Sequence, residues 1–173
     1  ALRDMMQNHM LQLLMLTAME PPVNLDNQSI RDEKVKVLKA LPHMTPREVA
    51  QNVVRGQYGP GIDGDDKVIG YRQEERVAPQ SNTETYVAIK VMVNNIRWAG
   101  VPFYLRTGKR MPCKTTEIAI QFSKPPEVLY FKEFQRLDSN LLVIKIQPRE
   151  GAFLQFNAKK PGARSEIIPV AMD

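Results

Sequence analysis

The sequence predicts an α+β fold, in which a mostly antiparallel β-sheet packs with a few helices. Helical patterns lie at the front of the 173-residue chain, and most of the later residues alternate between apolar and polar in short runs separated by turns. Helices and strands do not alternate as βαβ units, so a doubly wound parallel sheet is not expected. The first helix is expected to be buried.

This first helical stretch, residues 10–19, is apolar nearly all round and is interrupted only by Gln12 and Thr17. Such a pattern is typical of a buried rather than an amphipathic helix. The stretch is too short to cross a bilayer, which takes roughly 20 apolar residues. Polar side chains crowd just before it, at Asp4, Gln7, Asn8 and His9. The pattern fits either the floor of a polar pocket or a core helix with a solvated N-terminal end.

Two further helices are expected. Paired prolines at 21–22 end the first helix. Ser29 is then the expected N-cap of a helix over residues 30–40. Thr45 and Glu48 have the spacing of a capping box, with a proline at the first helical position, so a short helix is expected to start there.

Residues 59–64 read Gly-Pro-Gly-Ile-Asp-Gly and so satisfy the glycine spacing of a dinucleotide fingerprint. That interpretation is rejected, because Pro60 lies inside the motif, the nearby aspartates would repel a pyrophosphate, and no helix pattern comes after it. A calcium loop starting at Asp63 is rejected too, since Lys67 and Val68 occupy positions that need an oxygen ligand and a glycine. A surface loop is expected here.

Alternating runs predict strands in the rest of the chain, at residues 85–93, 101–106, 117–122, 141–147 and 152–157. A basic segment, residues 106–114, runs from the end of the second of these strands towards the third, and it holds Arg106, Lys109, Arg110 and Lys114 and no acidic residue. A strand end with a glycine beside a lysine lets backbone and ammonium groups converge on a phosphate. The alternative is a solvated basic turn.

Composition leaves the partner open. The length suits one domain with a sizeable core. A net charge of +5 suits nucleic acid, a membrane surface or a phosphorylated metabolite. The lone Cys113 excludes an internal disulfide and favours a reducing compartment. No signal-peptide pattern is found, and both ends look like cuts in a longer chain.

Residues 3–9, Arg-Asp-Met-Met-Gln-Asn-His, resemble the helix of glucose-6-phosphate dehydrogenases that bears the catalytic histidine. Further matching motifs occur in the order of that family, at residues 31–39, 56–58, 83–86, 97–103, 105–109, 147–148 and 159–162. The resemblance covers essentially the whole chain. It implies one truncated C-terminal domain over residues 1–173, for substrate binding and dimerisation, without the N-terminal dinucleotide-binding domain.

The implied reaction is oxidation of D-glucose 6-phosphate to 6-phospho-D-glucono-1,5-lactone with hydride transfer to NADP, the first step of the pentose phosphate pathway. By resemblance, His9 is the base that takes the C1 hydroxyl proton, a role that suits histidine near neutral pH. Asp4, Lys109, Lys114 and Gln147 match sugar-phosphate ligands. In an α-helix, Asp4 and His9 would lie about 140° apart around the axis, so a tight pair between them is not expected.

The resemblance also implies the partners. NADP would be bound mainly by the missing N-terminal domain, so the 173 residues alone are expected to be inactive. A homodimer or tetramer formed through the β-sheet, a cytoplasmic location and no metal are expected. Nucleic acid and membrane are not expected as partners.

Some members of the family carry a second, structural NADP on the C-terminal sheet. Arg106 and Lys145 keep basic character at two matching positions. Four other positions lack the matching cations or tyrosine of such members: Thr115, Ala119, Phe153 and Gln155. No tight structural NADP is therefore expected.

Two other functions would fit parts of the sequence. The first is a non-catalytic α+β module for sugar-phosphate binding or dimerisation, which the presence of the matching acid, base and cations disfavours. The second is nucleic-acid binding. Only the net charge favours it, because the basic residues outside 106–114 are scattered and no stacking-aromatic motif accompanies them.

Overall fold

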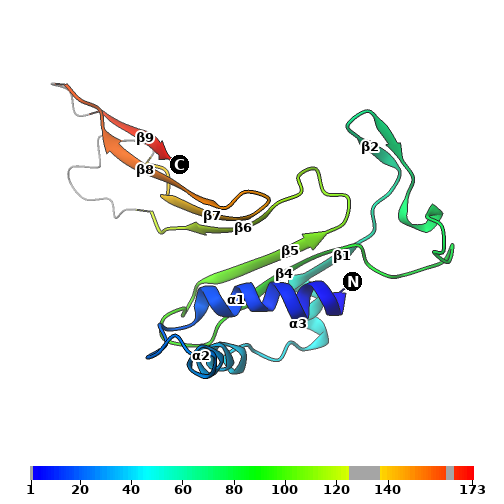
Figure 1. The fold of residues 1–173 in the computed structure, drawn as a ribbon, viewed down its shortest axis with the longest axis horizontal. Coiled ribbons are helices and arrows are strands. Elements are labelled where there is room, and N and C mark those ends of the chain that lie inside the picture. The colour runs from blue at the N-terminus through cyan, green and yellow to red at the C-terminus, as the bar shows by residue number, and fades with distance from the viewer. Residues whose placement is uncertain (1, 125–136, 163–165) are drawn as a thin grey trace. The chain divides into compact units, whose positions relative to one another are not determined.

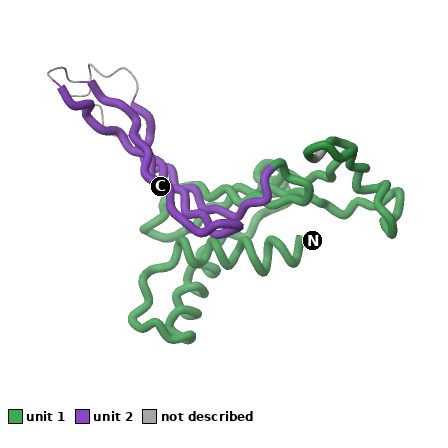
Figure 2. Tube along the Cα trace, turned by 45° about the horizontal axis from the view of Figure 1, so that its top comes forward, with its two compact units in different colours: residues 1–112 green, residues 113–173 purple. Residues whose placement is uncertain are grey.

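The computed structural model describes residues 2–124, 137–162 and 166–173 (Figure 1). The chain forms two compact units, residues 1–112 and 113–173 (Figure 2). Both contain antiparallel sheets, and the helices belong to the first unit. The predicted α+β class is thereby confirmed. One domain over residues 1–173 stays a prediction.

The first unit contains all the described helices and two small sheets. Its helices are the π-helix η1 (Arg3–Met10), α1 (Leu11–Ala18), α2 (Asn27–Lys39), α3 (Pro46–Asn52) and the 3₁₀-helix η2 (Tyr71–Gln73). Its strands are β1 (Val53–Gly56), β2 (Gly61–Asp63), β3 (Asp66–Val68), β4 (Tyr86–Met92) and β5 (Pro102–Gly108). β1, β4 and β5 pair in that order, and all pairs are antiparallel.

The core of this unit lies between the first helix and one face of the three-stranded sheet (Figure 1). Its buried residues are Met6, Leu14, Met15, Ala18, Val37, Val87, Val91, Val93 and Leu105. The strand residues among them follow the predicted alternation, since Val87 and Val91 share a face of β4. Leu16 is 46% exposed, so burial covers one side of α1 within this chain.

The N-cap of α2 differs from the prediction. Ser29 was the expected cap, but the helix begins at Asn27 and Asp26 caps it. An Asp26 carboxylate oxygen accepts hydrogen bonds from the backbone N–H groups of Gln28 and Ser29 at 2.9 and 3.0 Å. The Ser29 hydroxyl donates to the same carboxylate at 2.7 Å. A carboxylate can accept all three bonds at once, which explains why Asp26 wins over a serine.

The α3 prediction is confirmed. The Thr45 hydroxyl accepts from the backbone N–H of Glu48, and the Glu48 carboxylate accepts from the backbone N–H of Thr45 at 2.8 Å. These bonds lower the pKa of Glu48, with the backbone N–H of Thr45 as the largest cause.

We predict that the Asp26 cap makes stability depend on acid pH. The hydrogen bonds from Ser29, side chain first and backbone second, lower the pKa of Asp26 below its ordinary value near 4. A carboxyl with a lowered folded-state pKa stabilises the fold fully above its unfolded pKa, and this stabilisation is lost as the pH falls through the folded value. Asp26→Asn keeps a capping oxygen that does not titrate. The Tm difference between wild type and this variant should therefore shrink between pH 7 and pH 2, and a constant difference would contradict the prediction.

Residues 61–68 form a hairpin, whereas a surface loop was predicted. β2 and β3 are antiparallel, with Asp63 opposite Asp66. The two-residue turn between them has Gly64 at φ +65, a conformation that a glycine adopts without strain. The hairpin is nevertheless at the surface, because Ile62 is exposed.

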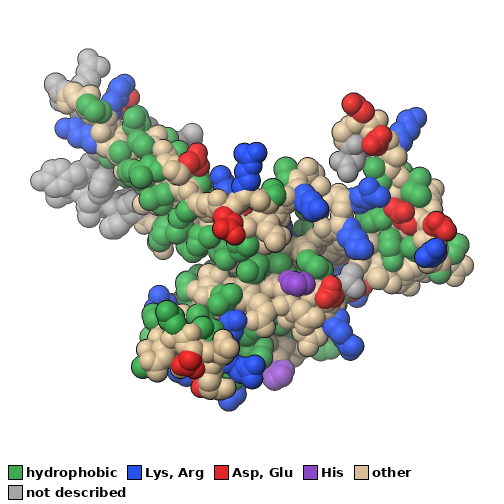
Figure 3. Space-filling model, viewed as in Figure 1, with side chains coloured by type: hydrophobic (Ala, Val, Ile, Leu, Met, Phe, Trp, Pro, Cys, Tyr) green, Lys and Arg blue, Asp and Glu red, His purple; other side chains and the backbone are tan. Residues whose placement is uncertain are grey.

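The second unit is a four-stranded antiparallel sheet in the order β6 (Thr116–Gln121), β7 (Leu141–Gln147), β8 (Gly151–Lys159) and β9 (Ile167–Met172). Three of these strands were predicted and β9 was not. The register places only apolar side chains across the middle of one face: Ile118, Ile120, Leu142, Ile144, Leu154, Phe156, Val170 and Met172. We call this set the apolar sheet face. Figure 3 shows apolar side chains exposed along the strands of this sheet.

No helix in the described ranges is both long enough and apolar enough to cross a bilayer.

Candidate functional site

His9 and Asp4 lie on η1, which is a π-helix and not the α-helix assumed from the sequence. The backbone N–H of Leu11 donates to the carbonyl of Met6, five residues earlier. Residues five apart in a π-helix lie one above the other, as residues four apart do in an α-helix. Asp4 and His9 are five apart, so they share one face of the helix. The separation of 140° derived from α-helical geometry is wrong for this segment.

Both side chains are exposed, whereas Met6 on the same helix is buried in the core. The buried side of η1 contacts β5. This packing fixes the helix against the sheet and leaves the carboxylate and the imidazole accessible to a ligand. A π-helical segment in a helix is frequently found at functional sites.

The other end of the same helical stretch is anchored by the connection between β4 and β5. The indole N–H of Trp98 donates to the carbonyl of Ala18 at 2.9 Å. Arg97 pairs with Glu20 at 2.9 Å, just past the helix end. These bonds satisfy a helix-terminal carbonyl and tie α1 to the sheet.

Lys109 comes directly after β5. Its backbone N–H donates to the carbonyl of Thr85 at 2.8 Å, and its side chain is exposed. Gly108 lies opposite Tyr86 in the sheet register. A Cβ at Gly108 would come within 2.9 Å of the Tyr86 ring and 3.0 Å of the Met111 sulfur, so the glycine lets the chain pass close to its neighbours.

Arg110 is held differently. It has a φ of +55, and its guanidinium lies 3.3 Å from the carboxylate of Glu74. The Tyr58 hydroxyl donates to the same carboxylate oxygen at 3.0 Å. Burial raises the pKa of the Tyr58 hydroxyl, and the bond to Glu74 raises it further. Sequence reasoning did not connect these three residues; Arg110 was counted only as one charge of the basic segment.

Lys114 and Gln147 belong to the second unit, where they lie at one end of the sheet. Gln147 ends β7 and pairs with Thr116, the first residue of β6. The Thr115 hydroxyl donates to the Gln147 carbonyl at 3.2 Å. Lys114 immediately precedes Thr115 and is exposed. The sheet register therefore brings these two predicted ligands to the same strand ends.

The five predicted site residues thus fall into groups that the structure defines separately. Asp4 and His9 share one helix face, and Lys109 extends from the strand β5 that this helix contacts. Lys114 and Gln147 meet at one end of the β6–β7 pair. The convergence of all five on one ligand stays a prediction.

The two candidates for a structural NADP also lie in different units. Arg106 is exposed on β5, opposite Ala88. Lys145 is exposed on β7, where Glu117 is its cross-strand neighbour and the Asp173 carboxylate is 3.8 Å from its ammonium. The Asp173 carboxylate partly offsets the charge of Lys145 for an anionic ligand.

The residues that should cradle a dinucleotide do not fit one. Residues 61–63, the middle of the glycine motif, form β2, and the chain turns from there into β3. A pyrophosphate site of this kind needs the motif to open a helix, whose N-terminal amides hold the anion. The strand at residues 61–63 supports the rejection of this motif.

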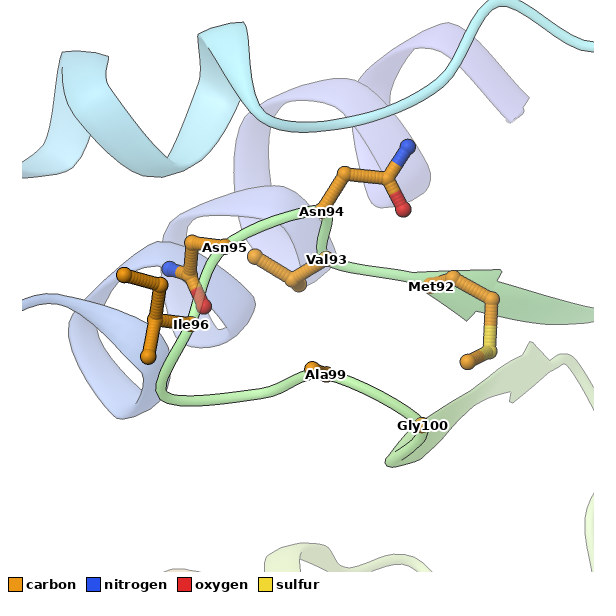
Figure 4. A pocket seen from close by; sticks show the side chains of 7 residues that line it. All are labelled: Met92, Val93, Asn94, Asn95, Ile96, Ala99 and Gly100. Atoms are coloured by element: carbon orange, nitrogen blue, oxygen red, sulfur yellow. The ribbon is translucent and has the colours of Figure 1, made fainter.

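A shallow pocket of about 470 Å³ lies along the connection between β4 and β5 (Figure 4). Its lining residues are Met92, Val93, Asn94, Asn95, Ile96, Ala99 and Gly100. None of them is charged, and none is a predicted site residue. Across the described ranges, no three His, Cys, Asp or Glu side chains are grouped as a metal ion would need.

Residues 1–173 match the sequence family described as the C-terminal domain of glucose-6-phosphate dehydrogenase. The chain belongs to this family. The chain is 53% identical to glucose-6-phosphate 1-dehydrogenase of Bacillus subtilis, with 100% of this chain and 35% of that protein covered. It is 49% identical to the enzyme of the same name from Mycolicibacterium smegmatis, with 99% and 34% covered.

Solved structures agree. A glucose-6-phosphate dehydrogenase in complex with its substrate glucose-6-phosphate superposes with a TM-score of 0.86 at 41% identity, covering 99% of this chain and 34% of that one. Glucose-6-phosphate 1-dehydrogenase from Mycobacterium avium gives a TM-score of 0.81 at 37% identity, with 99% and 34% covered. The chain therefore spans about a third of the length of these relatives. The resemblance inferred from the motifs is confirmed.

Proposed function

We propose that this chain is the sugar-phosphate-binding, base-bearing part of a glucose-6-phosphate dehydrogenase. The complete enzyme would oxidise D-glucose 6-phosphate to 6-phospho-D-glucono-1,5-lactone, with NADP as the hydride acceptor. The observation that carries the proposal is the match of 99% of the chain to a dehydrogenase solved with glucose 6-phosphate. The exposure of His9 and Asp4 on one helix face supports it.

His9 has the chemistry that the reaction needs from this chain. Oxidation at C1 removes the hydroxyl proton and a hydride from the same carbon, leaving a carbonyl. A neutral imidazole within hydrogen-bond reach of that hydroxyl takes the proton as the hydride leaves. Asp4, on the same face, can accept a hydrogen bond from a neighbouring sugar hydroxyl and so orient the ring.

The lysines would bind the other end of the substrate. Lys109 and Lys114 carry ammonium groups that form charge-assisted hydrogen bonds with a phosphate. Gln147 supplies an amide that can both donate to and accept from sugar hydroxyls. The two lysines would thus bind the phosphate electrostatically, whereas His9 would take the proton at C1 and Asp4 would orient the sugar ring.

The test is NADPH formation by the full-length enzyme with glucose 6-phosphate, glucose and other hexose phosphates. The proposal requires a kcat/KM for glucose 6-phosphate that exceeds the value for every other sugar tested. A higher value for another hexose phosphate would overturn the assignment of substrate.

We also propose that two copies associate through the sheet of the second unit, as a homodimer or as half of a tetramer. The apolar sheet face supports this, because eight apolar side chains on one face favour burial against another surface. Analytical ultracentrifugation of the full-length enzyme tests it. A monomer at micromolar concentration would overturn the proposal.

We predict that the enzyme binds no structural NADP at micromolar concentration. Arg106 and Lys145 keep basic character at two positions that match such a site, and Lys145 is flanked by Glu117 and Asp173. Each missing charge-assisted bond removes about 1.5–3 kcal/mol, and micromolar affinity needs about 8 kcal/mol. Calorimetric titration of NADP into the full-length enzyme should give one site per chain, and a second saturable site would contradict the prediction.

A further inference from the structure

The backbone of Lys109 is fixed by a ring of contacts within the first unit. On one side, its N–H donates to the Thr85 carbonyl at 2.8 Å. Thr85 is only 6% exposed, and its hydroxyl accepts from the backbone N–H of Tyr58 at 3.0 Å. Its own N–H donates to the Gly56 carbonyl at 2.9 Å. Lys109 is therefore tied, through a buried residue, to the segment that carries Tyr58.

The same segment holds the residue after Lys109. The Tyr58 hydroxyl and the Arg110 guanidinium both donate to Oε1 of Glu74, at 3.0 and 3.3 Å. The guanidinium carbon lies 5.9 Å from the centre of the Tyr58 ring, a cation–π distance. The Tyr58 ring packs edge-on against Tyr71 at 5.7 Å. The contacts thus run from Lys109 through Thr85, Tyr58 and Glu74 to Arg110, the next residue along the chain.

Arg110 is in an unusual backbone conformation. Its φ of +55 lies in the left-handed region, which non-glycine residues rarely adopt. Such a conformation persists where surrounding contacts determine it. The Arg110 side chain is 46% exposed and Glu74 is 29% exposed, so the ion pair is partly shielded from water. The pair can therefore hold the turn, and Glu74 offsets the charge that Arg110 would otherwise present to a phosphate.

We propose that Glu74 and Arg110 are positioning residues, which clamp the turn after β5 so that the Lys109 ammonium is aimed at the substrate phosphate. The proposal rests on the proposed function, because the clamp can affect substrate binding only if Lys109 contacts the phosphate. The clamp lowers the number of backbone conformations open to Lys109 before the substrate binds. Its effect is therefore on the binding of phosphorylated sugar and not on the chemical step at C1.

The experiment measures kcat and KM of the full-length enzyme for glucose 6-phosphate and for glucose. Arg110→Ala should raise KM for glucose 6-phosphate about 3- to 10-fold, within the range of coupling between residues in contact. It should change kcat, and KM for glucose, less than about 2-fold. Arg110→Lys should recover part of the loss, because an ammonium can still pair with Glu74. Glu74→Gln should shift KM in the same direction as Arg110→Ala.

Arg76→Ala is the matched control. Arg76 also has a positive φ, of 66, but its ion pair with Glu75 is fully open to water, with both side chains 90% exposed. The substitution removes the same charge and the same side chain from a residue that has the same left-handed backbone conformation. KM for both sugars should stay at the wild-type value.

A double-mutant cycle with Lys109→Ala separates the clamp from the proposed function. If Arg110 acts through Lys109, Arg110→Ala should add nothing to KM once Lys109 is alanine. An equal rise in both backgrounds, an equal loss on both sugars, or no effect of Arg110→Ala beside a clear effect of Lys109→Ala would overturn the clamp. If Lys109→Ala itself left the preference for phosphorylated sugar unchanged, the phosphate contact of the proposed function would fail instead, and the clamp with it.

Discussion

Replacing His9 with Asn in the full-length enzyme is expected to lower kcat by about 10²–10⁴-fold, the usual contribution of a general base. KM for glucose 6-phosphate should change far less, because the proton transfer contributes to the transition state and not to substrate binding. His9 is exposed on η1, so its loss leaves no cavity in the core and the fold should stay intact. Steady-state kinetics and a thermal unfolding curve on the same preparation check both parts.

The chain offers a matched control. Its second histidine, His43, is also exposed and lies in the connection between α2 and α3. His43→Asn makes the same chemical change and should leave kcat and KM at the wild-type values. If His9→Asn kept kcat within a few-fold of wild type, His9 would be an ordinary surface histidine of this helix, and another group would have to take the proton.

Much of the fold could be predicted because its elements carry strong local signals. The alternation over residues 141–147 predicts β7 with the observed bounds, since every second residue of a half-buried strand faces the same side. The Thr45–Glu48 pair predicts the start of α3 because both partners of a capping box lie within one turn. Signals of this kind involve residues that are close in sequence.

The errors arose where two local signals compete or where the signal is weak. Asp26 and Ser29 can each cap a helix, and only the structure shows that the carboxylate takes the backbone donors while the serine supports it. The hairpin turn at Gly64 and Asp65 was not predicted, although a two-residue turn that starts with glycine is a common hairpin connection. The π-helix is rare and was not predicted, and it changes which side chains share a face.

Some residues of the candidate site could be predicted from the sequence, and others could not. Lys109 stood out because a glycine and a strand end precede a cation, which is a local pattern. The contact of Arg110 with Glu74 joins residues 36 apart in sequence. No spacing rule connects such residues, because the hairpin and the 3₁₀ turn that precede Glu74 decide where its carboxylate lies. The chemical groups of the site could therefore be predicted from the sequence, whereas the contacts that hold these groups in place could not.

The second large effect is expected at the phosphate. Lys109→Ala and Lys114→Ala in the full-length enzyme should each raise KM for glucose 6-phosphate by about 10- to 100-fold. A charge-assisted hydrogen bond to a phosphate is worth about 1.5–3 kcal/mol, and each 1.4 kcal/mol corresponds to about tenfold in affinity. Both side chains are exposed, so neither substitution removes a core contact. Glucose lacks the phosphate, so its KM should change far less, and kcat for glucose 6-phosphate should stay within a few-fold of wild type.

Lys67→Ala serves as the control, because Lys67 is an exposed lysine on β3 and its loss changes the net charge by the same amount. If Lys67→Ala raised KM as much as the other two, the effect would be a general attraction of the basic chain for an anion, which salt should screen. Equal losses on glucose and glucose 6-phosphate would mean that Lys109 and Lys114 support the sugar ring or the fold. A selective loss on the phosphorylated sugar, which persists at high ionic strength, is the result that a direct phosphate contact requires, since a short contact inside a site is screened much less than a surface charge.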